Sequence, residues 1–186
     1  ALSEFIKTTG AFGAFVYGAG ERMLLPFGLH HFVYLPFFFT SLGGVETIDG
    51  QTVQGAINIY NAILGSPSTP FNIEVSRFVM NGKVIFAMFG LPGAALAFYK
   101  TALPKNKKKT AALMIAIVVP CILSGITEPL EYSFLFIAPI LYVFHALMAG
   151  LAYALTYALQ FNVAGSASFG GPLLSLIFNG IMGAAK

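Results

Sequence analysis

The chain has 186 residues, of which 57% are hydrophobic and 9% are charged, and its mean hydropathy is +0.80. Soluble domains carry about 25% charged residues, so the composition excludes an ordinary soluble domain and indicates an integral membrane protein. The net charge of +3 comes mostly from one lysine-rich loop and is not a nucleic-acid-binding signal. At about 20 apolar residues per crossing, the length allows roughly five or six membrane-crossing or re-entrant segments. Because the chain begins at Ala1 without an initiator Met, we expect a fragment or an excised domain.

A broken apolar segment, GERMLLPFGLHHFVYLPFFF at 20–39, carries polar side chains near its start. Pro26 and Gly28 interrupt it, and Arg22 stands eight residues before the histidine pair that begins at His30. Pro and Gly inside a membrane segment free backbone groups that need other partners. The pattern predicts a re-entrant hairpin lined with polar groups. The alternative is that Arg22 reaches to the membrane interface and that the histidines pack or cap.

The one long polar stretch, residues 43–82, contains Asp49 and Gly50 between two short runs with β propensity. Asp-Gly in this setting is the usual signal for a tight two-residue β-hairpin. Residues 54–64 then predict a short helix, and residues 71–80 predict a second, amphipathic one.

Residues 84–103 predict a transmembrane helix interrupted by LPG at 91–93. The loop KNKKK at 105–109 follows, and an apolar segment at 110–123 returns into the membrane. Lysines between two apolar segments place this loop in the cytoplasm by the positive-inside rule. A polybasic site for anionic lipid would lie on the same side.

The stretch SGITEPLEYSFLFIAPILY at 124–142 puts Glu128 and Glu131 inside an apolar tract. A charged side chain in hydrocarbon costs roughly 2.5–3.5 kcal/mol on insertion scales, which indicates a function for at least one of them. The alternative is a capped helix start, with Ser124 or Thr127 as N-cap and Glu131 in the first turn. That alternative explains Glu131 better than Glu128, so we assign the functional role to Glu128.

The rest of the chain offers few chemical groups. Long apolar segments at 134–159 and 172–185 predict further membrane helices, and His145 in the first of them is expected to be a packing histidine. The single cysteine, Cys121, excludes a disulfide framework. Metal-spaced Cys/His sets and phosphate-cradling glycine loops are absent from the sequence, so no metal and no cofactor are expected.

Three motifs together resemble one family. GITEPLEYSFLFIAPILYVFHALMAGL (125–151), ERMLLPFGLHH (21–31) and MFGLPGAALAFYKTALPKNKKK (88–109) are similar to elements of the glucose superfamily of bacterial phosphotransferase-system sugar permeases, the membrane subunit called enzyme IIC. The polar middle region resembles the maltose and α-glucoside branch.

The resemblance implies an all-α polytopic protein of the bacterial inner membrane, with transmembrane helices, re-entrant helical hairpins and a small β-hairpin. Residues 1–186 would be the C-terminal sugar-binding and transport part, without the N-terminal dimerisation half and without IIB or IIA domains. Such a permease binds an extracellular sugar, expected to be maltose, another α-glucoside or glucose. The sugar is translocated for phosphorylation by a phosphocysteine on a IIB domain. The expected partners are therefore the sugar, phosphorylated IIB, the lipid membrane and a second copy of the permease.

The resemblance also implies roles for individual residues. Glu128 of GITEP would bind a sugar hydroxyl and act as the candidate base for the accepting hydroxyl. His30 would make a second sugar contact, and Arg22 and Thr127 would complete the binding site. Cys121 would not be the phosphorylated cysteine, which belongs to IIB.

Two other functions stay open on the sequence. Glu128 and His30 could serve the proton relay of an ion-coupled sugar transporter. The chain could also be a membrane sugar sensor that does not transport.

Overall fold

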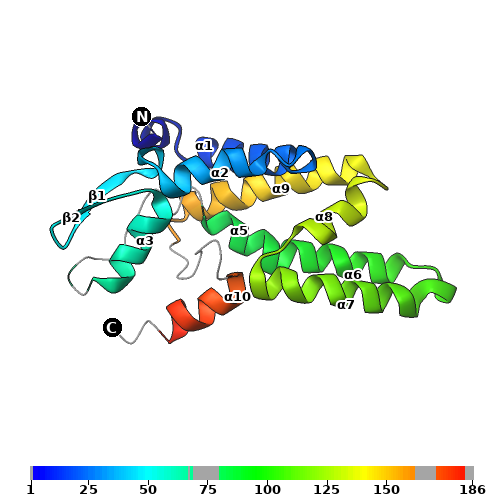
Figure 1. Cartoon of the computed structure of the whole chain (residues 1–186). Coiled ribbons are helices and arrows are strands. Elements are labelled where there is room, and N and C mark those ends of the chain that lie inside the picture. Colours follow the sequence, from blue (N-terminus) through cyan, green and yellow to red (C-terminus); the bar gives the residue numbers. More distant parts are fainter. Residues whose placement is uncertain (1, 67, 69–79, 162–170, 183–186) are drawn as a thin grey trace.

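Helices make up most of the fold, and a two-stranded sheet lies at one end of them (Figure 1). The structure, a computed structural model, describes residues 2–66, 68, 80–161 and 171–182. The regular elements in chain order are α1 (Leu2–Leu24), α2 (His30–Phe39), β1 (Val45–Ile48), β2 (Gln51–Gln54), α3 (Ala56–Gly65), α5 (Asn81–Ile85), α6 (Leu91–Thr101), α7 (Lys107–Ser124), α8 (Glu128–Leu135), α9 (Pro139–Ala158) and α10 (Pro172–Ser175).

Helices α1, α2 and α9 run side by side, and α6 and α7 form a hairpin that extends away from the sheet (Figure 1). Small residues allow α1 and α9 to approach closely. A Cβ atom at Gly150 would lie 2.7 Å from the carbonyl oxygen of Phe15, and one at Gly18 would lie 2.2 Å from the ring of Tyr153. The glycines of these two helices therefore determine how closely they pack.

The sequence correctly predicts the β-hairpin. Strands β1 and β2 pair antiparallel with Ile48 opposite Gln51, so only Asp49 and Gly50 remain in the turn. Both turn residues have positive φ, 49° and 81°, as this tight turn requires. Ile48 and three buried side chains of α3 form a small apolar cluster, which attaches the sheet to the helix. Helix α3 begins two residues later than predicted, and the helix expected over 71–80 lies almost wholly outside the described residues.

The helix predicted over 84–103 is present but is not broken at LPG. It runs from Asn81 to Thr101 through a π-helical turn at Phe86–Gly90, and Pro92 lies in the first turn of α6. Proline has no N–H to donate to the carbonyl four residues back. The wider turn before Pro92 accommodates that loss, so the helix continues.

The helix predicted over 134–159 begins later, at Pro139, because α8 ends at Leu135 and Pro139 occupies the first turn of α9. Gly125, with φ 70°, ends α7 in the left-handed conformation that favours glycine. Within the described ranges, Asn81–Thr101 and Pro139–Ala158 are the two helices long and apolar enough to cross a membrane.

Candidate functional site

Arg22, near the end of α1, is a buried cation with a side chain 1% exposed. Its Nη1 donates to Glu131 Oε1 at 3.1 Å and to Thr127 Oγ1 at 3.2 Å, and its Nη2 pairs with Glu21. The ring of Phe86, from the π-helical turn, lies 5.1 Å from the guanidinium carbon. A buried charge is tolerated when it is paired and hydrogen-bonded, and Arg22 meets both conditions.

Glu131, on α8, is fully buried and bonds side chains of two other helices, α1 and α9, and the residue that precedes α8. Its Oε1 accepts from His145 Nε2 of α9 at 2.7 Å as well as from Arg22. Its Oε2 accepts from Thr127 Oγ1 at 3.0 Å and from Arg22 at 3.3 Å. We call Glu21, Arg22, Glu131 and His145 the buried charge cluster.

Two tyrosines of α9 complete the surroundings of this cluster. Tyr153 OH donates to Glu21 Oε2 at 3.3 Å, and Tyr142 OH donates to the backbone oxygen of Arg22 at 2.5 Å. The cluster therefore joins α1 to α8 and α9, which lie more than a hundred residues later in the sequence.

A second pair of ionisable groups lies beside the cluster. His30 Nε2 of α2 is 3.9 Å from Glu128 Oε1 of α8, with side chains 7% and 34% exposed. Direct N–H···O hydrogen bonds are 2.7–3.2 Å long, so this pair is too far apart for one. His30 Nδ1 is buried and has no hydrogen-bond partner among the described residues, and the same is true of Arg22 Nε. His30 thus has an unused hydrogen-bonding atom, and its ring lies next to the partly exposed carboxylate of Glu128.

In the structure the four predicted site residues form two separate pairs. His30 faces Glu128, while Arg22 is bonded to Thr127 and to Glu131. Thr127 precedes α8, as the capped-start alternative has it, but its hydroxyl bonds these side chains and makes no backbone cap.

Sequence reasoning missed Glu131, Glu21 and His145 as members of a common cluster. It explained Glu131 by its place in the first turn of α8, which is correct but incomplete. One signal was present: residues 110–185 hold only Glu128, Glu131 and His145 as acidic, basic or histidine side chains. A buried carboxylate needs a partner, but the sequence did not show which carboxylate is buried.

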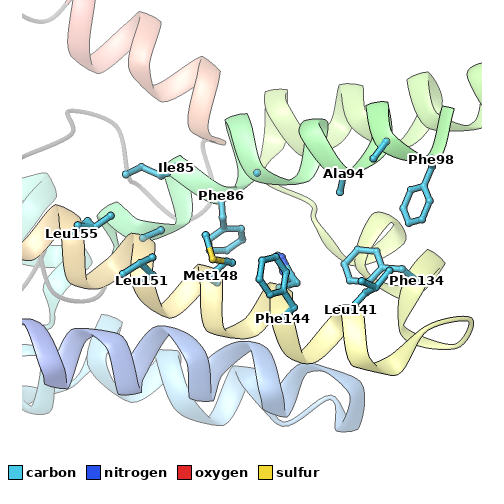
Figure 2. A pocket seen from close by; sticks show the side chains of 15 residues that line it. Ile85, Phe86, Ala94, Phe98, Phe134, Leu141, Phe144, Met148, Leu151 and Leu155 are labelled. Atoms are coloured by element: carbon cyan, nitrogen blue, oxygen red, sulfur yellow. The ribbon is translucent and has the colours of Figure 1, made fainter. Parts of the chain in front are cut away.

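An apolar groove of about 560 Å³ lies between α9 and the α5–α6 helix (Figure 2). Phe86, Phe98, Phe134, Phe144 and Met148 are among the side chains that line it, and His145 is the one ionisable residue in its wall. A polyhydroxylated ligand needs several convergent polar groups. The groove therefore suits apolar ligands or helices better than it suits a sugar.

The described ranges hold no cluster of three or more His, Cys, Asp or Glu that could bind a metal ion. Cys121 is buried on α7, and its thiol contacts the backbone oxygen of Ala87 at 3.3 Å.

Buried paired charges in an apolar chain, next to a His–Glu pair with free hydrogen-bonding capacity, are typical of a membrane protein that handles a polar solute. Comparison with known proteins gives the family. The family model "Phosphotransferase system, EIIC" matches residues 1–150, and the chain belongs to this family.

Two curated relatives match nearly the whole chain. The maltose-specific EIICB component of the PTS system of Escherichia coli (strain K12) is 42% identical over 182 residues, which cover 97% of this chain and 34% of that protein. The alpha-glucoside-specific EIICB component of Leptotrichia buccalis is 43% identical over 178 residues, 96% of this chain and 32% of that protein. The chain thus spans about a third of the length of the curated relatives it matches.

Proposed function

We propose that this chain is the C-terminal sugar-binding and transport part of a phosphotransferase-system permease, and that its sugar is maltose or another α-glucoside. Glucose is the second candidate. The names of the two relatives support the sugar class, and the family supports the transport system. The observation that carries the proposal is the His30–Glu128 pair: His30 Nε2 lies 3.9 Å from Glu128 Oε1, too far for a direct hydrogen bond, and the Glu128 side chain is 34% exposed.

The proposed sugar-binding set is Arg22, His30, Thr127 and Glu128. A hydroxyl both donates and accepts, so one sugar hydroxyl can donate to the Glu128 carboxylate and accept from an imidazole N–H. Arg22 Nε, buried and without a partner in the described part of the chain, is a further donor. Such a ligand would give hydrogen bonds to buried groups that otherwise lack them, which is favourable.

Phosphorylation would occur at the same place. The sugar hydroxyl oxygen attacks the phosphorus of a phosphocysteine on the IIB domain, the sulfur–phosphorus bond breaks, and the cysteine leaves as a thiolate. Glu128 takes the hydroxyl proton as general base. The remaining task is to hold the hydroxyl in line with the phosphoryl group, which is a matter of positioning.

The proposed setting is the bacterial inner membrane, crossed several times, with the α6–α7 loop in the cytoplasm where IIB acts. The lysines at 105 and 107–109 lie in and after the Pro104–Asn106 turn and are exposed, in keeping with the positive-inside rule. The segment from α1 through the Leu25–Phe27 turn to α2 is the candidate re-entrant hairpin. A homodimer would form through the N-terminal half of the complete permease.

Sugar titration tests the proposed site. The complete permease in lipid nanodiscs is titrated with maltose, glucose and N-acetylglucosamine without a phosphoryl donor. A maltoside detergent must be avoided, because its headgroup carries the test sugar. We expect binding of an α-glucoside that Glu128→Gln weakens by about tenfold to a hundredfold, the cost of losing a hydrogen bond to a charged group, and that the exposed-strand control Glu46→Gln leaves unchanged. Unaltered binding by a folded Glu128→Gln variant contradicts the placement of the site.

Uptake by membrane vesicles tests the transport class. We expect accumulation of phosphorylated sugar that requires phosphorylated IIB and survives a proton uncoupler. Uptake that the uncoupler stops, with no need for a phosphoryl donor, contradicts group translocation.

A further inference from the structure

Glu131 has no bonding capacity left for a ligand. An ionised carboxylate offers about four lone-pair positions. Glu131 uses them for Arg22 Nη1, which lies within 3.3 Å of both oxygens, for Thr127 Oγ1 and for His145 Nε2. Its side chain is also 0% exposed. Glu131 is therefore not a sugar ligand, although it lies three residues after Glu128.

These bonds attach helix α8 to α1 and α9. It has only eight residues and follows the three-residue connection 125–127 after α7. Glu128 and Glu131 lie within its first turns, three residues apart, so they share one stretch of backbone. The bonds of Glu131 to α1 and α9 therefore also hold the backbone that carries Glu128.

The other half of the His30–Glu128 pair is connected to the same cluster. Arg22 and His30 flank the Leu25–Phe27 turn. Tyr142 OH of α9 donates to Arg22 O at 2.5 Å, and Tyr132 OH of α8 donates to Leu25 O at 3.4 Å. The backbone that leads to His30 is thus held to α9 at Arg22, whose side chain bonds Glu131, and to α8 at Leu25.

We infer that Glu131 and His145 are positioning residues for the sugar site: they hold the Glu128 carboxylate and the His30 imidazole at their separation without touching the sugar. That the ligand is a sugar rests on the proposed function. The positioning of Glu128 and His30, however, is a property of the sugar-free protein. A residue that holds a reacting group in place can matter as much as one that touches substrate, because displacements of about 1 Å cost up to about a hundredfold.

The first test needs no sugar. The imidazole ¹⁵N signals of His30 and His31 in the complete permease are assigned as those that disappear in His30→Gln and in His31→Gln. We expect Glu131→Gln to shift the His30 signal, with His31, which bonds Tyr34 OH at 2.6 Å, less affected. Glu46→Gln on exposed β1 is the matched control. An unmoved His30 signal in a folded Glu131→Gln variant overturns the inference.

The second test measures coupling. If Glu131 acts through Glu128, then Glu131→Gln weakens sugar binding roughly tenfold to a hundredfold in the wild-type background. In a Glu128→Gln background it adds less than about twofold, because residues that act through one another are not additive. Equal losses in both backgrounds overturn the inference. If Glu128→Gln itself leaves binding intact, the proposed sugar site fails, and the histidine signals alone decide whether Glu131 positions His30.

His145 supplies a pair of variants in case Glu131→Gln does not fold. His145→Gln keeps an N–H that can reach Glu131, whereas His145→Leu leaves Glu131 Oε1 one donor short. We expect the His30 signal and the sugar affinity to change in His145→Leu and to return toward the wild-type values in His145→Gln. Loss of thermal stability alone, with the His30 signal and the affinity unchanged in both variants, overturns the inference.

Discussion

Replacing Arg22 by Met should be among the most destabilising single changes in this chain. The variant removes the guanidinium bonds to Glu131, Thr127 and Glu21 and the contact with the Phe86 ring. Two carboxylates then remain buried without their cation. Removing one partner of a buried ion pair costs about 3–5 kcal/mol.

That free energy corresponds to roughly a hundredfold to a few thousandfold in the ratio of folded to unfolded protein, because about 1.4 kcal/mol is a factor of ten. His145 and Thr127 still bond Glu131 in the variant, so we expect the lower half of that range.

The assay is equilibrium unfolding by SDS in bicelles, followed by far-UV circular dichroism because the chain has no tryptophan. Lys105→Met removes an exposed cation and should change the free energy of unfolding by less than about 0.5 kcal/mol. The double variant Arg22→Met/Glu131→Met should be more stable than Arg22→Met, since apolar replacement of both partners can be nearly neutral. A loss below about 1 kcal/mol for Arg22→Met refutes the view that the cluster stabilises the fold as a buried ion network.

Three further predictions concern single residues. Gly18→Ala should lower the free energy of unfolding by about 1–3 kcal/mol, because its Cβ would lie 2.2 Å from the buried ring of Tyr153. A Cβ at Gly20, in the same helix, meets nothing within 4 Å, so Gly20→Ala should raise that free energy by about 0.5–1 kcal/mol. Equal effects of the two variants contradict the close contact between Gly18 and Tyr153. Gly50→Ala should weaken the β-hairpin by about 1–2 kcal/mol, since φ is 81° there, and hydrogen exchange over residues 45–54 should accelerate. Cys121 is buried, so a water-soluble maleimide should label the single cysteine only after SDS is added, and labelling of the folded protein refutes this.

The membrane class, the hairpin turn and the approximate helix positions could be predicted from the sequence because they depend on local chemistry. Asp49 and Gly50 form a tight turn through their own backbone preferences, and Gly125 ends a helix for the same reason. The motif resemblance, built from contiguous residues, indicated the family that the comparison then confirmed. The predicted interruption of the helix at LPG was wrong because a π-helical turn, a local backbone adjustment, compensates for Pro92.

Which of two neighbouring carboxylates is buried was decided only by the tertiary structure. Glu128 and Glu131 have similar apolar flanks in the sequence, yet the side chain of Glu128 is 34% exposed and that of Glu131 is 0% exposed. The difference arises because Arg22, 109 residues away, and His145, 14 residues away, meet at Glu131 when α1, α8 and α9 pack. A carboxylate can be buried at low cost only where such partners converge, and that convergence depends on the packing of helices distant in the chain.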